Sequence, residues 1–476
     1  MRPRSGRGRL PAALAAVIAM ASTAAAGTSS TAAGDTLSYG VDVGVAESDN
    51  VTLVPTDKIS QTIAMTDVDF DVKQQSRLVD VDAKGNFSYL DYVQGAYGTE
   101  LIGRFDGVGR LALIPQRLTW VLQDDFGQAA LDPFTPTIPT NLENVNYVST
   151  GPDLMLRLGA SNFVDMSARV ARAEYATSPF NSNRLLGNLG WGLQLSALSS
   201  ISLNADTERV LFENTAVNTD FDRTNGFVRY AIKGARTDLS VDLGATVIDQ
   251  NGTSTRGGLA KIDLARKISS AAKLTLVAGR NLTDASTSFS SLQSGAIGLV
   301  GTAPAAVTSI SYTSNYVTAG WQYERYRTTL AVSGHYEKNS YGGAQELDYD
   351  RGGAEFRVER KLTRALNLQV LGRLYKTDYT HAGAVPTVAP LSAGYENGLV
   401  PPNGSSDYAD GLVAAVLAWR HGRALEVRLR AEHSSRVTTG VDTGYHENRV
   451  LLTVGYRPQA VQSSEDMGEP SNGPAT

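Results

Sequence analysis

Acidic side chains stand at every second position of one N-terminal segment. Asp67, Asp69 and Asp71 alternate with apolar residues, and Asp80 and Asp82 repeat the pattern shortly afterwards. Carboxylates in such a ladder can hold a hard cation such as Ca²⁺ or pair with basic groups. Alternate residues on one strand face lie about 7 Å apart, too far for neighbours alone to chelate one ion. The spacing therefore favours a solvated or arginine-paired ladder over a metal site.

Basic side chains follow the same alternating pattern late in the chain. They stand at Arg357, Arg373, Arg428, Arg430 and Arg449, and Glu426 and Glu432 share the parity of their neighbouring arginines. If the strands close into a barrel, the last strand lies beside the first, so acidic and basic walls become neighbours. Two outcomes are open. The walls either create a transverse field that orients charged or dipolar solutes, or their charges join in ion pairs.

The five histidines show no catalytic or metal-binding pattern. The sequence has no His-Glu-x-x-His pair and no Gly-x-Ser-x-Gly motif. His433 and Ser434 are adjacent, and adjacent residues of a strand point to opposite faces, so they do not form a dyad. A pair of Ser434 with His446 stays an open alternative. We therefore expect no enzymatic activity, no cofactor and no bound metal.

Alternation with a period of two runs from LSYGVDVGV near the N-terminus to NRVLLTVGY near the C-terminus. It predicts β-strands, several of about ten residues or more, which is longer than a soluble sandwich needs. Short turns alternate with long loops rich in Gly, Pro, Ser, Thr and Asn, at 129–144, 281–315 and 381–407. The sequence therefore predicts an all-β fold, a transmembrane antiparallel up-and-down β-barrel of about 16–20 strands, with about 18 as the best value.

The two faces of these strands carry different chemistry. The strand face that carries the charged residues needs water, so we expect it to line a wet lumen. The apolar face suits contact with lipid. The residues expected to line the lumen are Asp67, Asp69, Asp71, Arg357, Arg373, Glu426, Arg428, Arg430, Glu432 and Arg449. Those expected to face lipid are Val68, Phe70, Leu425, Val427, Leu429, Val450, Leu452, Val454 and Tyr456. Tyr and Trp residues near strand ends are expected to form girdles at the membrane interfaces.

The two ends of the chain differ from the strands. Residues 1–26 run from basic through apolar to small side chains, which is the order of a secretory signal peptide. We expect the barrel over 35–457 and a disordered polar tail over 458–476. The absence of cysteine excludes a disulfide framework, and a net charge of -5 argues against nucleic acid as a partner. These features predict export to the outer membrane of a Gram-negative cell.

A resemblance to a known family rests on three phrases. They are GVAESDNVTLVPTDKIS at 44–60, RLTWVLQDDFG at 117–127 and YHENRVLLTVGY at 445–456. In these phrases and in its layout of strands, the sequence resembles the β-barrel porin 2 group of outer-membrane proteins. That resemblance implies an association with exopolysaccharide production and export. The last strand, which ends on Tyr456, also resembles the C-terminal assembly signal of outer-membrane barrels.

Three functions are compatible with these features. The first is a passive, water-filled pore of mixed charge linked to exopolysaccharide export or biosynthesis. The second is a general diffusion porin for small polar solutes, and the third is a structural or adhesive barrel whose loops bind outside partners. The resemblance favours the first. The expected partners are outer-membrane lipid, the barrel assembly machinery, and the exopolysaccharide or its export machinery.

Overall fold

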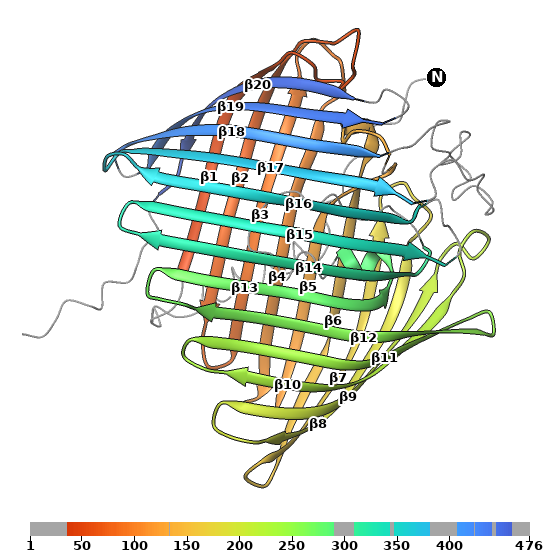
Figure 1. Cartoon of the computed structure of the whole chain (residues 1–476). Coiled ribbons are helices and arrows are strands. Elements are labelled where there is room, and N and C mark those ends of the chain that lie inside the picture. Colours follow the sequence, from red (N-terminus) through yellow and green to blue (C-terminus); the bar gives the residue numbers. More distant parts are fainter. Residues whose placement is uncertain are drawn as a thin grey trace, which may run out of the picture.

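The described residues form twenty strands in one closed antiparallel sheet in the computed structural model. The structure describes residues 36–132, 134–289, 309–342, 347–380, 407–422, 424–439 and 444–458. Each strand pairs with the next along the chain, and β1 (Thr36–Ser48) pairs with β20 (Tyr445–Tyr456) to close the barrel. Strands on the two sides of the barrel cross in projection (Figure 1), because barrel strands tilt against the axis. The predicted up-and-down barrel is confirmed, and the described residues form 20 strands, the upper end of the expected 16–20 and two more than the best value of 18.

The remaining elements follow in chain order. They are β2 (Gln61–Gln75), β3 (Val79–Tyr92), β4 (Glu100–Ile114), β5 (Leu118–Ala130), the 3-10 turn η1 (Pro139–Asn141), β6 (Leu142–Leu158), β7 (Asn162–Tyr175), β8 (Ser182–Gln194), β9 (Ser199–Phe212), β10 (Phe221–Lys233), β11 (Thr237–Gln250), β12 (Thr253–Lys267), β13 (Ala272–Thr283), β14 (Tyr312–Arg325), β15 (Thr328–Tyr341), β16 (Tyr349–Lys361), β17 (Leu366–Tyr379), β18 (Tyr408–His421) and β19 (Leu425–Thr438). The predicted signal peptide, and the predicted tail beyond Pro458, lie outside the described residues. No helix in the described part of the chain is long and apolar enough to cross a membrane.

The two rims of the barrel differ in their connections. Even-numbered strands lead to the next strand through turns of a few residues, such as 234–236 and 326–327, which form the short-turn rim. Most odd-numbered strands lead into longer loops, such as 49–60 and 131–141, which form the long-loop rim. The start of β1 and the end of β20 both lie at the short-turn rim. The rims therefore present different chemistry to the two sides of the barrel.

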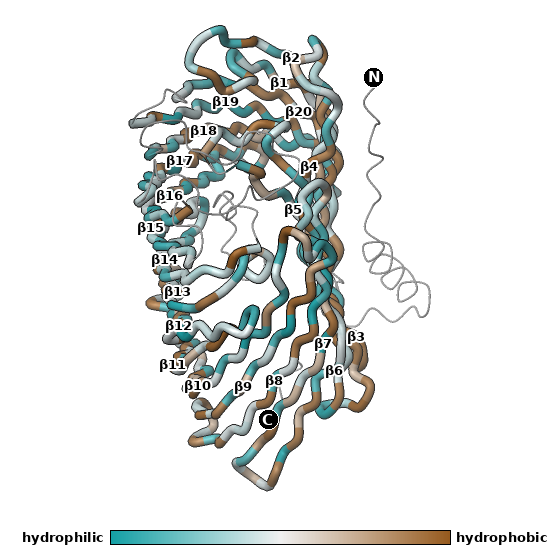
Figure 2. The backbone as a smooth tube through the Cα atoms, turned by 90° about the vertical axis from the view of Figure 1, so that its right-hand side faces the viewer, coloured by the Kyte–Doolittle hydropathy of each residue, from teal (hydrophilic) through white to brown (hydrophobic). Residues whose placement is uncertain are grey.

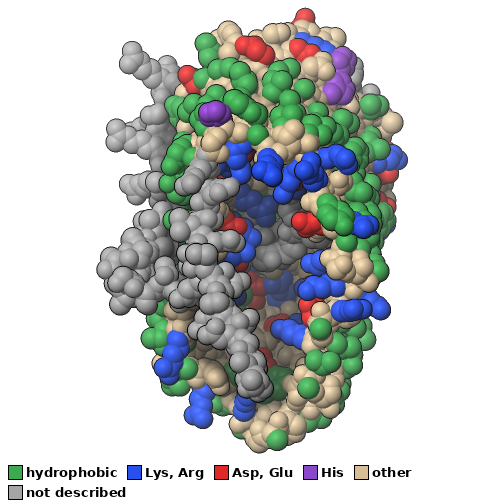
Figure 3. Space-filling model, turned by 90° about the vertical axis from the view of Figure 1, so that its left-hand side faces the viewer, with side chains coloured by type: hydrophobic (Ala, Val, Ile, Leu, Met, Phe, Trp, Pro, Cys, Tyr) green, Lys and Arg blue, Asp and Glu red, His purple; other side chains and the backbone are tan. Residues whose placement is uncertain are grey.

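Side chains alternate between the outer surface and the interior along the strands. On β1, Val41, Val43 and Val45 are exposed, whereas Asp42 between them is buried. Figure 3 shows hydrophobic side chains over the outer surface, while Lys, Arg, Asp and Glu gather around a hollow interior. A closed sheet leaves no unpaired edge, and an apolar outer surface suits lipid. The molecule is thus a barrel of the outer-membrane type.

Two strand pairs, β5–β6 and β13–β14, each separate from the preceding strand at the long-loop rim. β12 pairs with β13 only where 260–267 faces 273–280, and β4 pairs with β5 only where 105–114 faces 118–126. Beyond these limits β13 continues with β14, and β5 continues with β6. Figure 2 shows the end of β13 turning from the wall into the interior. The broken ladders free the tops of both strand pairs to enter the lumen.

Candidate functional site

The seam that closes the barrel brings together charges from the two ends of the chain. Arg457, which directly follows β20, pairs with Asp42 of β1 and lies 2.5 Å from Asp69 of β2. Gly455 stands opposite Asp42 in the β1–β20 register, and a Cβ there would overlap the Asp42 carboxylate. A larger residue at position 455 would therefore displace the Asp42 carboxylate from its place in the seam. Of the two outcomes left open by the sequence, ion pairing is the one observed at the seam.

Further pairs extend this network along β19. Glu426 is buried and accepts hydrogen bonds from Arg428 and, at 3.0 Å, from Arg420 of β18. The Arg428 guanidinium also lies 3.7 Å from Asp42. Removing one partner of a buried ion pair leaves an uncompensated charge and destabilises the fold. The seam is therefore held by interlocked charges in addition to backbone hydrogen bonds.

The other residues predicted to line the lumen share the interior parity but do not form one cluster. Arg430 pairs with Glu432, and Arg449 lies 2.8 Å from Glu447. Arg357 and Arg373 are half-buried on β16 and β17. Asp67 lines a cavity at the short-turn rim, and Asp71 stands opposite Lys84 of β3. The residues predicted to face lipid have the opposite parity. Val68, Leu425, Leu429, Val450, Leu452, Val454 and Tyr456 are exposed, and Phe70 and Val427 are half-buried. Their contact with lipid stays a prediction.

Replacing Arg457 by alanine should weaken the closed barrel by about 2 kcal/mol, because Asp42 is buried and would keep only the longer contact with Arg428. The measurement is urea unfolding of the refolded protein, followed by tryptophan fluorescence. The matched control is Arg110→Ala, since Arg110 and Asp80 form a half-exposed pair at 3.4 Å that should contribute little. Equal midpoints for the two variants would show that the seam network adds no stability.

A segment after β13 docks inside the barrel on the wall formed by β7 to β10. We call residues 284–289 the docking segment. The guanidinium of Arg184 on β8 is fully buried and lies 2.6 Å from Asp284 and 2.9 Å from Glu208 of β9. Arg223 of β10 pairs with Glu208 and lies 3.7 Å from Asp284. Two bases and two acids thus balance in a buried network that joins a loop to three strands.

Neighbouring contacts fix the docking segment in place. The Tyr175 hydroxyl of β7 lies 2.7 Å from Ser286 Oγ, and Thr287 donates a hydrogen bond of 2.6 Å to Asp284. Phe289 packs in an apolar cluster that includes Tyr175 and Phe180. Burial alone would raise the pKa of the Asp284 carboxyl, but Arg184, Arg223 and Thr287 hold that pKa well below its usual range. The carboxylate is therefore charged at neutral pH, and the network is complete.

The loop between β5 and β6 crosses to the opposite side. Its Phe134 lies 4.6 Å from the ring of Tyr379 at the end of β17, measured between ring centroids. Both rings belong to a buried cluster completed by Tyr312, Tyr341, Leu347, Tyr349 and Tyr408. Arg436 stacks over Tyr408 at 4.0 Å. Because β5 and β17 are remote from each other in the order of the sheet, this contact bridges the lumen.

The sequence reasoning missed the docking segment and its network. Arg184, Glu208 and Arg223 look like any other charged residue on the interior parity of a strand, and no spacing links them to Asp284. One local signal was available. Asp284 immediately precedes a short helical turn and could have been read as its N-cap residue. That signal predicts the turn but not its position in the barrel.

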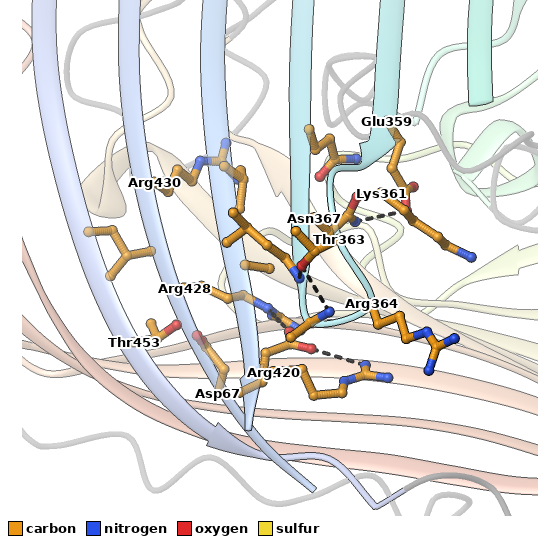
Figure 4. Close-up of a pocket in the computed structure, with 17 residues that line it drawn as sticks. Asp67, Glu359, Lys361, Thr363, Arg364, Asn367, Arg420, Arg428, Arg430 and Thr453 are labelled. Carbon is orange, nitrogen blue, oxygen red and sulfur yellow. Dashed lines mark hydrogen bonds and ion pairs between the residues drawn. The ribbon is translucent and has the colours of Figure 1, made fainter. Parts of the chain in front are cut away.

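A cavity of about 710 Å³ opens at the other end, beside the short turns of β16–β19. Its basic lining residues are Lys361, Arg364, Arg420, Arg428 and Arg430, and its acidic ones are Asp67, Glu359 and Glu426. Figure 4 shows the charged ends of Lys361, Arg364 and Arg420 extending to the same side. Asn367 donates a hydrogen bond of 2.9 Å to Glu359 and so orients that carboxylate. The lumen is therefore hollow near the short-turn rim and bridged near the long-loop rim.

Comparisons with known proteins give structural matches only. No family model and no curated protein matches the sequence. Among solved structures, a ferric enterobactin receptor mutant from Pseudomonas aeruginosa is 8% identical, with 90% of this chain and 81% of that chain covered and a TM-score of 0.45. The FrpB iron transporter from Neisseria meningitidis is 10% identical, with 88% and 81% covered and a TM-score of 0.41. The siderophore receptor PirA from Pseudomonas aeruginosa is 9% identical, with 89% and 80% covered and a TM-score of 0.40.

The function expected from the sequence needs correction. It was a passive, water-filled pore linked to exopolysaccharide, with a diffusion porin or an adhesive barrel as alternatives. The docking segment instead lies inside the barrel against β7 and β8, and the β5–β6 loop bridges the lumen. With no family match, the resemblance to β-barrel porin 2 and its exopolysaccharide partners has no support. What stands is a closed barrel of the outer-membrane type.

Proposed function

We propose that the protein is a gated outer-membrane transporter. The docking segment and the β5–β6 loop narrow its lumen at the long-loop end, and passage of a solute requires displacement of the docking segment. The observation that carries this proposal is the fully buried Arg184, which holds Asp284 of the docking segment against β8. A passive pore would leave that path open.

Features of the chain around the network suit a movable gate. Asp284 belongs to a connection that continues to residue 311, whereas Arg184, Glu208 and Arg223 belong to paired strands. The docking segment follows the part of β13 that has left β12, so undocking breaks no ladder between those two strands. The closed and open states then differ mainly by the contacts of one short segment. A ligand that binds the open state more tightly shifts this equilibrium toward opening.

Replacing Asp284 by asparagine should open the lumen. The change removes one charge from a buried network, which weakens docking by about 3 kcal/mol and shifts the closed-to-open equilibrium about 100-fold. Planar-bilayer recordings should show rare openings for the wild-type protein and frequent ones for the variant. The matched control is Asp222→Asn, since Asp222 pairs with Arg209 in a half-exposed contact. Steady full conductance of the wild-type protein would contradict a gate.

A chemical probe can report the position of the docking segment directly. The chain has no cysteine, so Ser286→Cys introduces a unique thiol at a position that is buried when the segment is docked. A membrane-impermeant maleimide should label this thiol slowly in the otherwise unchanged protein and rapidly when Asp284→Asn is added. Equal labelling rates would show that Asp284 does not hold the segment.

A further inference from the structure

The cavity at the short-turn rim carries an excess of positive charge. Five basic and three acidic side chains line it, and the lining residues come from β2 and from β16 to β20. Its volume of about 710 Å³ lies within the range typical of small-molecule sites. A concave site with converging side chains is a better binding place than a flat charged surface.

Two of the basic groups have no carboxylate partner among the described residues. Arg420 and Arg428 are bound to Glu426, and Arg430 is bound to Glu432. Within the described residues, no carboxylate pairs with the side chain of Lys361 or Arg364. Glu359, the remaining acid on this side, accepts from Asn367. Lys361 and Arg364 are therefore free to bind an anion from solution.

The short-turn rim around the cavity is basic as well. Each of the turns 76–78, 115–117, 234–236, 326–327 and 362–365 contains one arginine and no carboxylate. Figure 3 looks onto this rim and shows Lys and Arg side chains around the hollow. An excess of positive charge at the mouth of a hollow raises the local concentration of anions. Anions are therefore drawn to this mouth.

The long-loop rim has the opposite charge. The acidic residues in the described parts of its loops are Asp49, Asp57, Asp132, Glu213, Asp220, Asp284, Asp348 and Asp407, and the basic one is Lys58. The two ends of the barrel thus differ in sign along its axis. A general electrostatic attraction of anions to the whole protein would not produce this difference, since the net charge is -5. The attraction is local to the short-turn mouth.

We infer that this cavity binds an oxyanion, of the phosphate or polyphosphate class, through Lys361 and Arg364. Arginine presents a fork of donors that fits phosphate oxygens, and lysine adds a compact charge with three donors. The paired Arg420, Arg428 and Arg430 supply further positive potential at the site. The assignment of this cavity as the binding site of the transported solute rests on the proposed function. The binding of an oxyanion to the cavity does not depend on that function.

The test uses tripolyphosphate as the probe and the full chain refolded into nanodiscs. Isothermal titration should detect binding to the wild-type protein, and Lys361→Gln with Arg364→Gln should weaken it by about tenfold or more. The matched control is Arg327→Gln with Arg360→Gln, which removes two charges from the same rim at residues that do not line the cavity. That variant should bind within about twofold of the wild-type protein.

Each result decides the inference. An equal loss in both double variants would overturn it, because binding would then reflect the charge of the whole rim. No binding to the wild-type protein would also overturn it. Citrate, a tricarboxylate of lower charge, tests carboxylate chemistry at the same site, and tighter binding of citrate than of tripolyphosphate would reject the phosphate class. Because these are binding measurements on the closed protein, their failure is distinct from a failure of gating in bilayer recordings.

Discussion

Replacing Arg184 by leucine is expected to undock the segment at 284–289. If the segment were held in its docked position, the barrel would lose about 3–5 kcal/mol of stability. The change leaves Glu208 and Asp284 buried together with only Arg223 to balance them. Asp284 can escape with its loop, but Glu208 sits on a paired strand and cannot. The molecule therefore relieves the excess negative charge by opening the lumen. We expect frequent conductance and rapid labelling of a cysteine at position 286.

A double variant separates charge from packing in this result. In Arg184→Leu combined with Asp284→Leu, the remaining Arg223 and Glu208 balance each other, so urea unfolding should return toward the wild-type midpoint. The lumen should nevertheless stay open, because the ion pair across it is gone. If the midpoint does not recover, lost packing at Arg184 explains the destabilisation. If the double variant closes again, the Arg184 to Asp284 pair does not act as the gate.

Much of the barrel could be predicted from the sequence because its rules are local. Alternation between Leu429 and Arg430 follows from the geometry of a single strand, without knowledge of its neighbours. The meeting of Asp42 with Arg457 follows from closure alone, since an up-and-down barrel places its last strand beside its first. The contact of acidic and basic segments was therefore foreseeable, and their pairing was one of two foreseeable outcomes.

The strand count and the gate could not be predicted in this way. The turns at 251–252 and 326–327 are so short that they interrupt the alternation only briefly, and two fewer strands were expected than are present. The path of the loop after Thr283 is set by tertiary contacts with β7 to β10, and Arg184 and Asp284 are 100 residues apart. An open lumen was inferred from strand faces alone. The loops that bridge it left no trace in the strand pattern.

Replacing Leu429 by arginine should sharply reduce assembly, whereas Arg430→Leu, one residue along β19, should leave it nearly unchanged. Leu429 lies on the outer surface in register with Leu417 of β18 and Leu452 of β20, and all three are exposed. If this aliphatic row faces lipid, an arginine there costs about 2–4 kcal/mol near the bilayer midplane. Arg430 points inward, and its pair with Glu432 is partly solvated, so losing it costs about 1 kcal/mol or less.

The comparison measures the folded fraction after refolding into lipid vesicles, read as the heat-modifiable band on a gel. Leu429→Gln is the control for polarity without charge, and its yield should fall between those of the wild-type protein and Leu429→Arg. Arg430→Leu should instead change what enters the lumen, because Arg430 lines the cavity beside Arg428. Equal yields for the arginine and leucine variants would mean that the exposed face of β19 does not meet lipid. In that case the apolar surface around Leu417 and Leu452 would have to be buried against another protein.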